Sequence, residues 1–124
     1  MTAQTSAIAY ALLALLPIAM QIAVAAGAPL GPYTVGGRFP GRLPPLWRGL
    51  ALVQAGLLGI MAAVVLDRGG VIATPLPPVL FWPVVGLTGL TLLANAASRS
   101  PPERRLWTPI IALMLAAALA TAIL

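Results

Sequence analysis

Residues 98–124 read SRSPPERRLWTPIIALMLAAALATAIL, an arginine-rich segment followed by a long stretch without any charge. A helix needs about 20 apolar residues to cross the roughly 30 Å hydrocarbon core of a bilayer. Residues 106–124 have that length, and a helix satisfies its own backbone hydrogen bonds, as a lipid-exposed segment must. This segment is therefore predicted to be a membrane-spanning helix.

Three further charge-free runs precede it, at residues 6–26, 49–66 and 79–97. The chain has 124 residues, of which 60% are hydrophobic and 7% charged, whereas about 25% of the residues in a soluble domain are charged. The last connection is short enough to make its two helices antiparallel neighbours. We expect one domain over residues 1–124, an all-α, integral membrane, antiparallel four-helix bundle.

The arginines predict the orientation of this bundle. All seven basic residues are arginine: Arg38, Arg42 and Arg48 in the first connection, Arg68 in the second, and Arg99, Arg104 and Arg105 in the third. The positive-inside rule places the first and third connections in the cytoplasm and both termini outside. Aromatic residues typical of membrane interfaces agree, with Trp47 and Trp107 at the inner boundary and Phe81 and Trp82 at the outer one.

The composition argues against catalysis and against bound metals. The chain has no cysteine and no histidine, so the usual nucleophile–base pairs, zinc sites and haem ligands are missing. Its two carboxylates, Asp67 and Glu103, are expected on opposite sides of the membrane. We expect a protein that is not an enzyme and has neither cofactor nor metal. No nucleic-acid-binding motif accompanies the arginines.

Two local patterns concern helix starts and helix packing. Ser100-Pro101-Pro102-Glu103 is typical of a capping box, which makes Glu103 a helix-start residue rather than a catalytic acid. Small residues at four-residue spacing predict close helix contacts. They are Ala19, Ala23 and Gly27 in the first span, Ala55, Gly59 and Ala63 in the second, and Ala112, Ala116 and Ala120 in the fourth, with Gly86 and Gly89 in the third.

Polar residues inside the spans are the candidate site, because each needs a partner in hydrocarbon. Gln21, Gln54 and Asn95 come from three spans and lie toward the cytoplasmic end of each. Arg48 and Arg99 could reach the same level by snorkelling. We predict a polar cavity open to the cytoplasm, with amides on its walls and arginines at its rim, which would suit phosphate or carboxylate. The alternative is that the amides bond only to one another and hold the helices together.

The first connection, residues 27–48, is long and rich in glycine and proline. It is either a functional loop, which could fold back as a lid over the cavity, or a plain linker. Gly36-Gly37-Arg38 could form an anion-binding nest. Arg38, Arg42 and Arg104 are further candidates for contacts with an anion.

The chain also resembles a known group of proteins. The segments Gly27-Ala28-Pro29-Leu30-Gly31, Gly36-Gly37-Arg38, Gly41-Arg42-Leu43-Pro44 and Glu103-Arg104-Arg105-Leu106-Trp107-Thr108-Pro109 resemble those of small four-span bacterial membrane proteins. The resemblance covers most of the chain and implies four spans in a bacterial inner membrane. Because its motifs lie in loops and helix starts, it implies no particular function.

Together these observations favour a non-enzymatic membrane protein. We expect it to bind a small anionic or amphiphilic ligand such as a lipid headgroup or an organic anion, and a role in transporting that ligand is the extension of this hypothesis. The alternative is an accessory or assembly subunit of a larger membrane complex. The expected partners are membrane lipids and further copies of the chain, or that complex.

Overall fold

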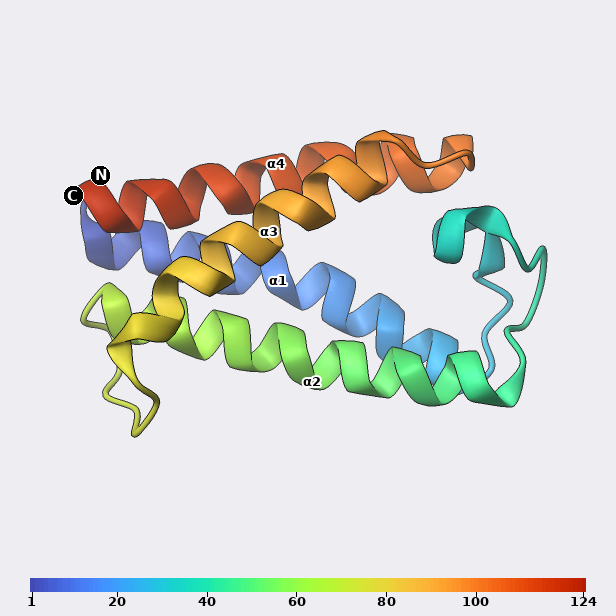
Figure 1. The fold of residues 1–124 in the computed structure, drawn as a ribbon, viewed down its shortest axis with the longest axis horizontal. Coiled ribbons are helices and arrows are strands. Elements are labelled where there is room, and N and C mark those ends of the chain that lie inside the picture. Colours follow the sequence, from blue (N-terminus) through green and yellow to red (C-terminus); the bar gives the residue numbers. More distant parts are fainter.

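The computed structural model describes residues 1–124 and consists of four long helices without strands (Figure 1). The helices are α1 (Ala3–Ala25), α2 (Pro45–Arg68), α3 (Phe81–Ala96) and α4 (Pro101–Ile123), with short 3₁₀ turns η1 (Gly31–Tyr33), η2 (Val35–Gly37) and η3 (Pro78–Leu80). Each of the four helices, α3 taken together with η3, is long and apolar enough to cross a membrane. The prediction of an all-helical membrane bundle is confirmed.

α2 and α4 extend beyond the charge-free runs that predicted them, whereas α3 is shorter than its run of residues 79–97. α2 includes Arg48 and Arg68, and α4 includes Arg104 and Arg105. Arginine is a good helix former, so a charge ends the apolar run without ending the helix. The third connection therefore shrinks to residues 97–100.

The helix starts differ from the prediction in one respect. α4 does begin directly after Ser100, but no side chain caps it, so the predicted capping box is wrong. A capping box occurs instead at α1, where the hydroxyl oxygen of Thr2 accepts from the Thr5 N–H at 3.1 Å and that of Thr5 accepts from the Thr2 N–H at 2.9 Å. Ser100 and Glu103 bond to a distant part of the chain, as described below.

The bundle is asymmetric. α1 packs against both α2 and α4, and α3 packs mainly on α4, while α2 makes few contacts with α3 or α4. In Figure 1, α3 lies across the front of the bundle, close to α2 at the end that carries both termini and close to α4 at the other. We call the end with the connections 26–44 and 97–100 the loop end, and the opposite one the terminal end.

The apolar core lies mostly toward the terminal end. Its largest fully buried side chains include Tyr10, Phe81 and Met114, around which Met61 and Val65 pack. Of the alanines in the predicted stripes only Ala55 is buried, and the other buried alanines are Ala7, Ala14, Ala51, Ala62 and Ala118. Ala19, Gly59 and Ala116 of the predicted stripes are exposed, because each helix turns a different face to its neighbours.

One buried hydrogen bond joins α1 to α3 inside this core. The Tyr10 hydroxyl lies 2.8 Å from the Thr88 hydroxyl, and the Thr88 hydroxyl donates to the Val84 carbonyl, also at 2.8 Å. Since that carbonyl takes the threonine proton, Tyr10 is the donor to Thr88. Hydrogen bonds of this kind between membrane helices contribute about 0.6 kcal/mol on average.

Tyr10→Phe and Thr88→Val should therefore show a coupling energy of about 0.6 kcal/mol in a double-mutant cycle of unfolding in mixed detergent micelles. Thr91→Val is the matched control, because Thr91 makes the same intrahelical bond to Leu87 without a tyrosine partner. A coupling of Tyr10 to Thr88 no larger than its coupling to Thr91 would contradict the assignment.

Candidate functional site

The interior face of each helix changes from apolar to polar on the way to the loop end. Residues spaced three and four apart form these faces: Ala7, Tyr10, Ala14, Pro17 and Gln21 in α1; Leu58 and Gln54 in α2; Phe81, Val84, Thr88, Thr91 and Asn95 in α3; Met114, Ile111, Trp107 and Glu103 in α4. Such spacing keeps side chains on one side of a helix. Each face thus ends in a residue that can hydrogen-bond.

These polar ends meet in one cavity. A cavity of about 130 Å³ is lined by Pro17, Met20, Gln21, Tyr33, Thr34, Gln54, Leu58, Thr91, Asn95, Glu103, Trp107 and Ile111. A neighbouring cavity of about 180 Å³ shares Gln21, Thr34 and Gln54 with it and extends to Trp47. We call the two together the amide cavity. The structure thus brings together the three amides that were predicted to share a site.

The amides are not paired with one another. Asn95 donates from Nδ2 to the Thr91 carbonyl of its own helix at 2.8 Å. Gln21 and Gln54 are half-buried, and neither amide takes part in a side-chain hydrogen bond. Amide-to-amide bonding is therefore not what holds these helices together, and two amides remain free to contact a ligand.

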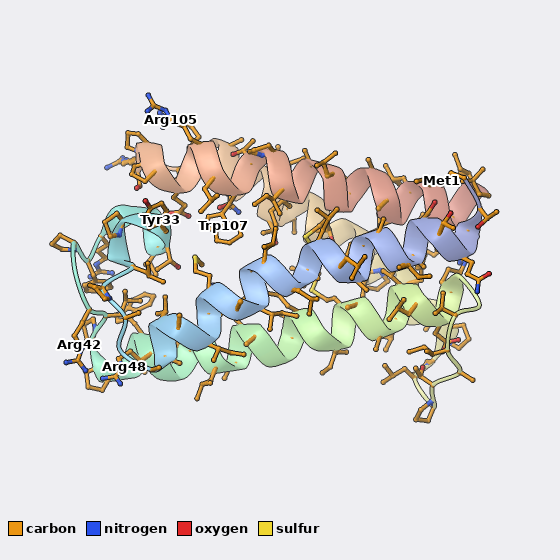
Figure 2. All side chains as sticks on the ribbon, turned by 180° about the vertical axis from the view of Figure 1, so that it is seen from behind. Met1, Tyr33, Arg42, Arg48, Arg105 and Trp107 are labelled. Carbon is orange, nitrogen blue, oxygen red and sulfur yellow. The ribbon has the colours of Figure 1, made fainter.

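The predicted arginine rim does not line the amide cavity. Arg48 donates from Nε to the Ala25 carbonyl at 3.0 Å, which satisfies a carbonyl that the end of α1 leaves open. Arg99 is exposed on the connection 97–100. Figure 2 shows Arg48 and Arg42 at the corner of the loop end near the start of α2, and Arg105 pointing away from the bundle.

The other two candidates for anion contacts are engaged nearby. The guanidinium of Arg38 lies 5.4 Å from the ring centre of Phe39 and 5.6 Å from that of Trp47. Arg104 donates from Nη1 to the Ser98 carbonyl at 2.8 Å. Positive charge thus surrounds the loop end without entering the amide cavity.

The charged residue that does line the cavity is Glu103. Its Oε2 accepts from the Gly36 N–H at 2.8 Å. The predicted nest is not formed, because only the Gly36 N–H contacts this carboxylate while the N–H groups of Gly37 and Arg38 donate to the carbonyls of Thr34 and Val35. Sequence reasoning treated Glu103 as a cap and missed it as a wall residue, although it stands four residues before Trp107 and eight before Ile111, on the buried face of α4.

The connection 26–44 folds back over the cavity and is fixed to α4. Besides the bond from Gly36 to Glu103, Trp107 donates from Nε1 to the Tyr33 carbonyl at 3.0 Å, and Ser100 donates from its hydroxyl to the Pro32 carbonyl. Figure 2 shows Trp107 pointing inward from α4 beside the turn that carries Tyr33. The segment is thus held in the position expected for a lid, and we call it the lid.

The lid itself closes at Gly31. The Gly31 N–H donates to the Gly41 carbonyl at 3.0 Å. A Cβ at Gly31 would collide with the carbonyl oxygen of Phe39, whereas a Cβ at Gly41 would meet open space. Only glycine allows the backbone segments at Gly31 and Phe39 to approach this closely.

The amide cavity can bind through hydrogen bonds, through one negative charge and through apolar contact. No protein-family model, curated protein or solved structure matches the chain. The function must therefore be inferred from this cavity.

Gly31→Ala should open the lid, because overpacking of this kind costs about 1–3 kcal/mol. We expect trypsin to cleave after Arg38 and Arg42 about fivefold faster or more in detergent micelles, with the products identified by mass spectrometry. Gly41→Ala is the control and should cleave at the wild-type rate. Equal rates for the two variants would show that Gly31 does not hold the lid.

Proposed function

We propose that the chain is a non-enzymatic integral membrane protein that binds a small amphiphilic ligand in the amide cavity. The observation that carries this proposal is the gradient along the cavity wall. Gln21, Gln54 and Asn95 line it toward the loop end, and Leu58 and Ile111 line it toward the middle of the bundle. The apolar space beyond Leu58 and Ile111 measures only about 10 Å³, which is too small for an alkyl chain, so the tail would leave the cavity along the exposed apolar faces of the helices. A polar head and an apolar tail would each find a matching surface.

The geometry favours an amphiphile over a free anion. Arg48 and Arg99 were expected to supply the positive charge for an anion, but neither lines the cavity. The lining charge is that of Glu103, which would repel a phosphate or carboxylate placed beside it. An anionic part of the ligand would instead contact the arginines outside the cavity, such as Arg38.

Binding is supported more directly than conduction. Beyond this small apolar space, the buried side chains of Tyr10, Met61 and Met114 fill the bundle. A ligand could pass toward the terminal end only if this packing opened. Membrane lipids are therefore the first candidates to occupy the cavity, since they reach it without crossing the core.

We propose that the loop end faces the cytoplasm. Six of the seven arginines lie at this end: Arg38, Arg42 and Arg99 in its connections, and Arg48, Arg104 and Arg105 in the helix starts beside them. At the terminal end there is only Arg68. The positive-inside rule then leaves both termini outside. The resemblance to small bacterial proteins favours the inner membrane.

Replacing Gln21 or Gln54 by leucine should weaken lipid binding. A hydrogen bond contributes about 0.5–1.5 kcal/mol, so each change should lower lipid retention about two- to tenfold. The measurement is native mass spectrometry of the protein released from nanodiscs of phosphatidylethanolamine and phosphatidylglycerol. The readout is the fraction of protein that keeps a lipid.

Gln4→Leu is the matched control, because Gln4 is an exposed amide of α1 at the terminal end. It should retain as much lipid as the wild-type chain. Undiminished retention in Gln21→Leu and Gln54→Leu would contradict binding in the amide cavity, and so would an equal loss in Gln4→Leu.

One observation favours the alternative of an accessory subunit. Gly49, Gly56 and Gly59 of α2 are exposed, and a Cβ at any of them would meet open space within the chain. A Cβ at Gly86 or Gly89 of α3 would likewise meet open space. These glycines serve no contact inside the bundle, and glycine lets a second helix approach closely.

If this face of α2 contacts another chain or a second copy, Gly56→Leu should abolish that assembly while the unfolding transition in micelles stays unchanged. Native mass spectrometry would show a discrete complex for the wild-type chain and a monomer for the variant. A wild-type chain that is monomeric when released from native membranes, with lipid still bound, would contradict the alternative.

A further inference from the structure

We infer that the polar end of the ligand carries a positively charged ammonium group, which binds between Glu103 and the aromatic residues of the lid and α4. This inference rests on the proposed binding in the amide cavity and adds the chemical class of the ligand. The class is an amphiphilic ammonium, whose sources are a zwitterionic phospholipid with an ethanolamine head or a free alkylamine.

The first support is the state of Glu103. Among the residues that line the cavity it is the one with a charge, and it forms no salt bridge with any of the arginines. Its Oε2 accepts a single backbone N–H, that of Gly36. A carboxylate can accept several hydrogen bonds, so Glu103 keeps acceptor capacity for N–H groups of a ligand.

The second support is the aromatic lining. Tyr33 and Trp107 line the cavity together with Glu103. The faces of tyrosine and tryptophan rings attract an ammonium group within about 6 Å. The Trp107 N–H and the Tyr33 carbonyl are bonded to each other, which fixes the indole beside the lid. A carboxylate next to two aromatic side chains is a suitable surrounding for an organic cation.

The third support is the distribution of positive charge. Arg38 stacks on Trp47, which lines the second part of the amide cavity, and Arg104 is bonded to the Ser98 carbonyl. Negative charge therefore lies inside the cavity and positive charge lies around it. This order matches a zwitterionic head whose ammonium group binds at Glu103 and whose phosphate lies toward the arginines of the loop end.

The test compares two lipids that differ in the ammonium group. Phosphatidylethanolamine and phosphatidylglycerol with identical acyl chains are supplied in equal amounts in nanodiscs, and the retained lipids are counted by native mass spectrometry. Since hydrogen bonds to a charged group are stronger than neutral ones, the wild-type chain should retain phosphatidylethanolamine about tenfold over phosphatidylglycerol.

Glu103→Gln should bring this ratio to about one by lowering the retention of phosphatidylethanolamine to that of phosphatidylglycerol. Glutamine keeps an oxygen that can accept from Gly36, so the lid stays in place. Asp67→Asn is the matched control, since Asp67 is the other carboxylate of the chain and bonds to Thr74 at the terminal end. Its ratio should equal that of the wild-type chain.

A second arm identifies the source of the ammonium group. Dodecylammonium and dodecyl sulfate are added separately to protein in neutral detergent. If dodecylammonium binds in a way that depends on Glu103 and no phosphatidylethanolamine is retained, the ligand is a free amine. If phosphatidylethanolamine is retained, the ligand is the lipid.

Equal retention of the two lipids together with no binding of dodecylammonium would overturn the inference, and so would a preference that survives Glu103→Gln. Failure of the proposed function looks different: Gln21→Leu and Gln54→Leu would then retain as much lipid as the wild-type chain, whatever its headgroup.

Discussion

The bonds between the connection 26–44 and the first turns of α4 determine the shape of the loop end. Beside a membrane, the carbonyls of Pro32 and Tyr33 need donors, and Ser100 and Trp107 supply them. Glu103 accepts from Gly36 in return. The lid therefore fills the space between the starts of α2 and α4, two helices that make few contacts with each other. Without these bonds, the polar ends of the helices would face open water rather than a cavity.

The fold follows from the sequence to a large extent because a membrane leaves few choices. Charge-free runs predict the four helices, and the grouping of Arg38 and Arg99 at one end agrees with the way the connections meet. The predicted boundaries of α2 and α4 were too short because an arginine ends an apolar run without breaking a helix. The choice of packing alanines could not be predicted, since alanine is present on every face and only tertiary contacts decide that Ala7 and Ala14 are buried.

The candidate site was predictable in part. Gln21, Gln54 and Asn95 are rare polar residues at one depth, and the structure places all three on one cavity. The partners of the arginines could not be predicted, because Arg48 and Arg104 bond to backbone carbonyls left open where helices and turns end. Glu103 was missed because Ser100 and Glu103 have the spacing of a local cap. The hydrophobic periodicity of α4 was the available signal that Glu103 faces inward.

Glu103 lines the cavity and also accepts the hydrogen bond from Gly36 that holds the lid to α4. Any molecule that binds there more tightly when the lid is closed must, by thermodynamic reciprocity, favour the closed lid by the same factor. Binding of a ligand inside the cavity would therefore change the conformation of a segment on the outer surface of the protein, which is in contact with water. A partner protein that contacts the lid could then distinguish the ligand-bound bundle from the ligand-free one, although no domain moves.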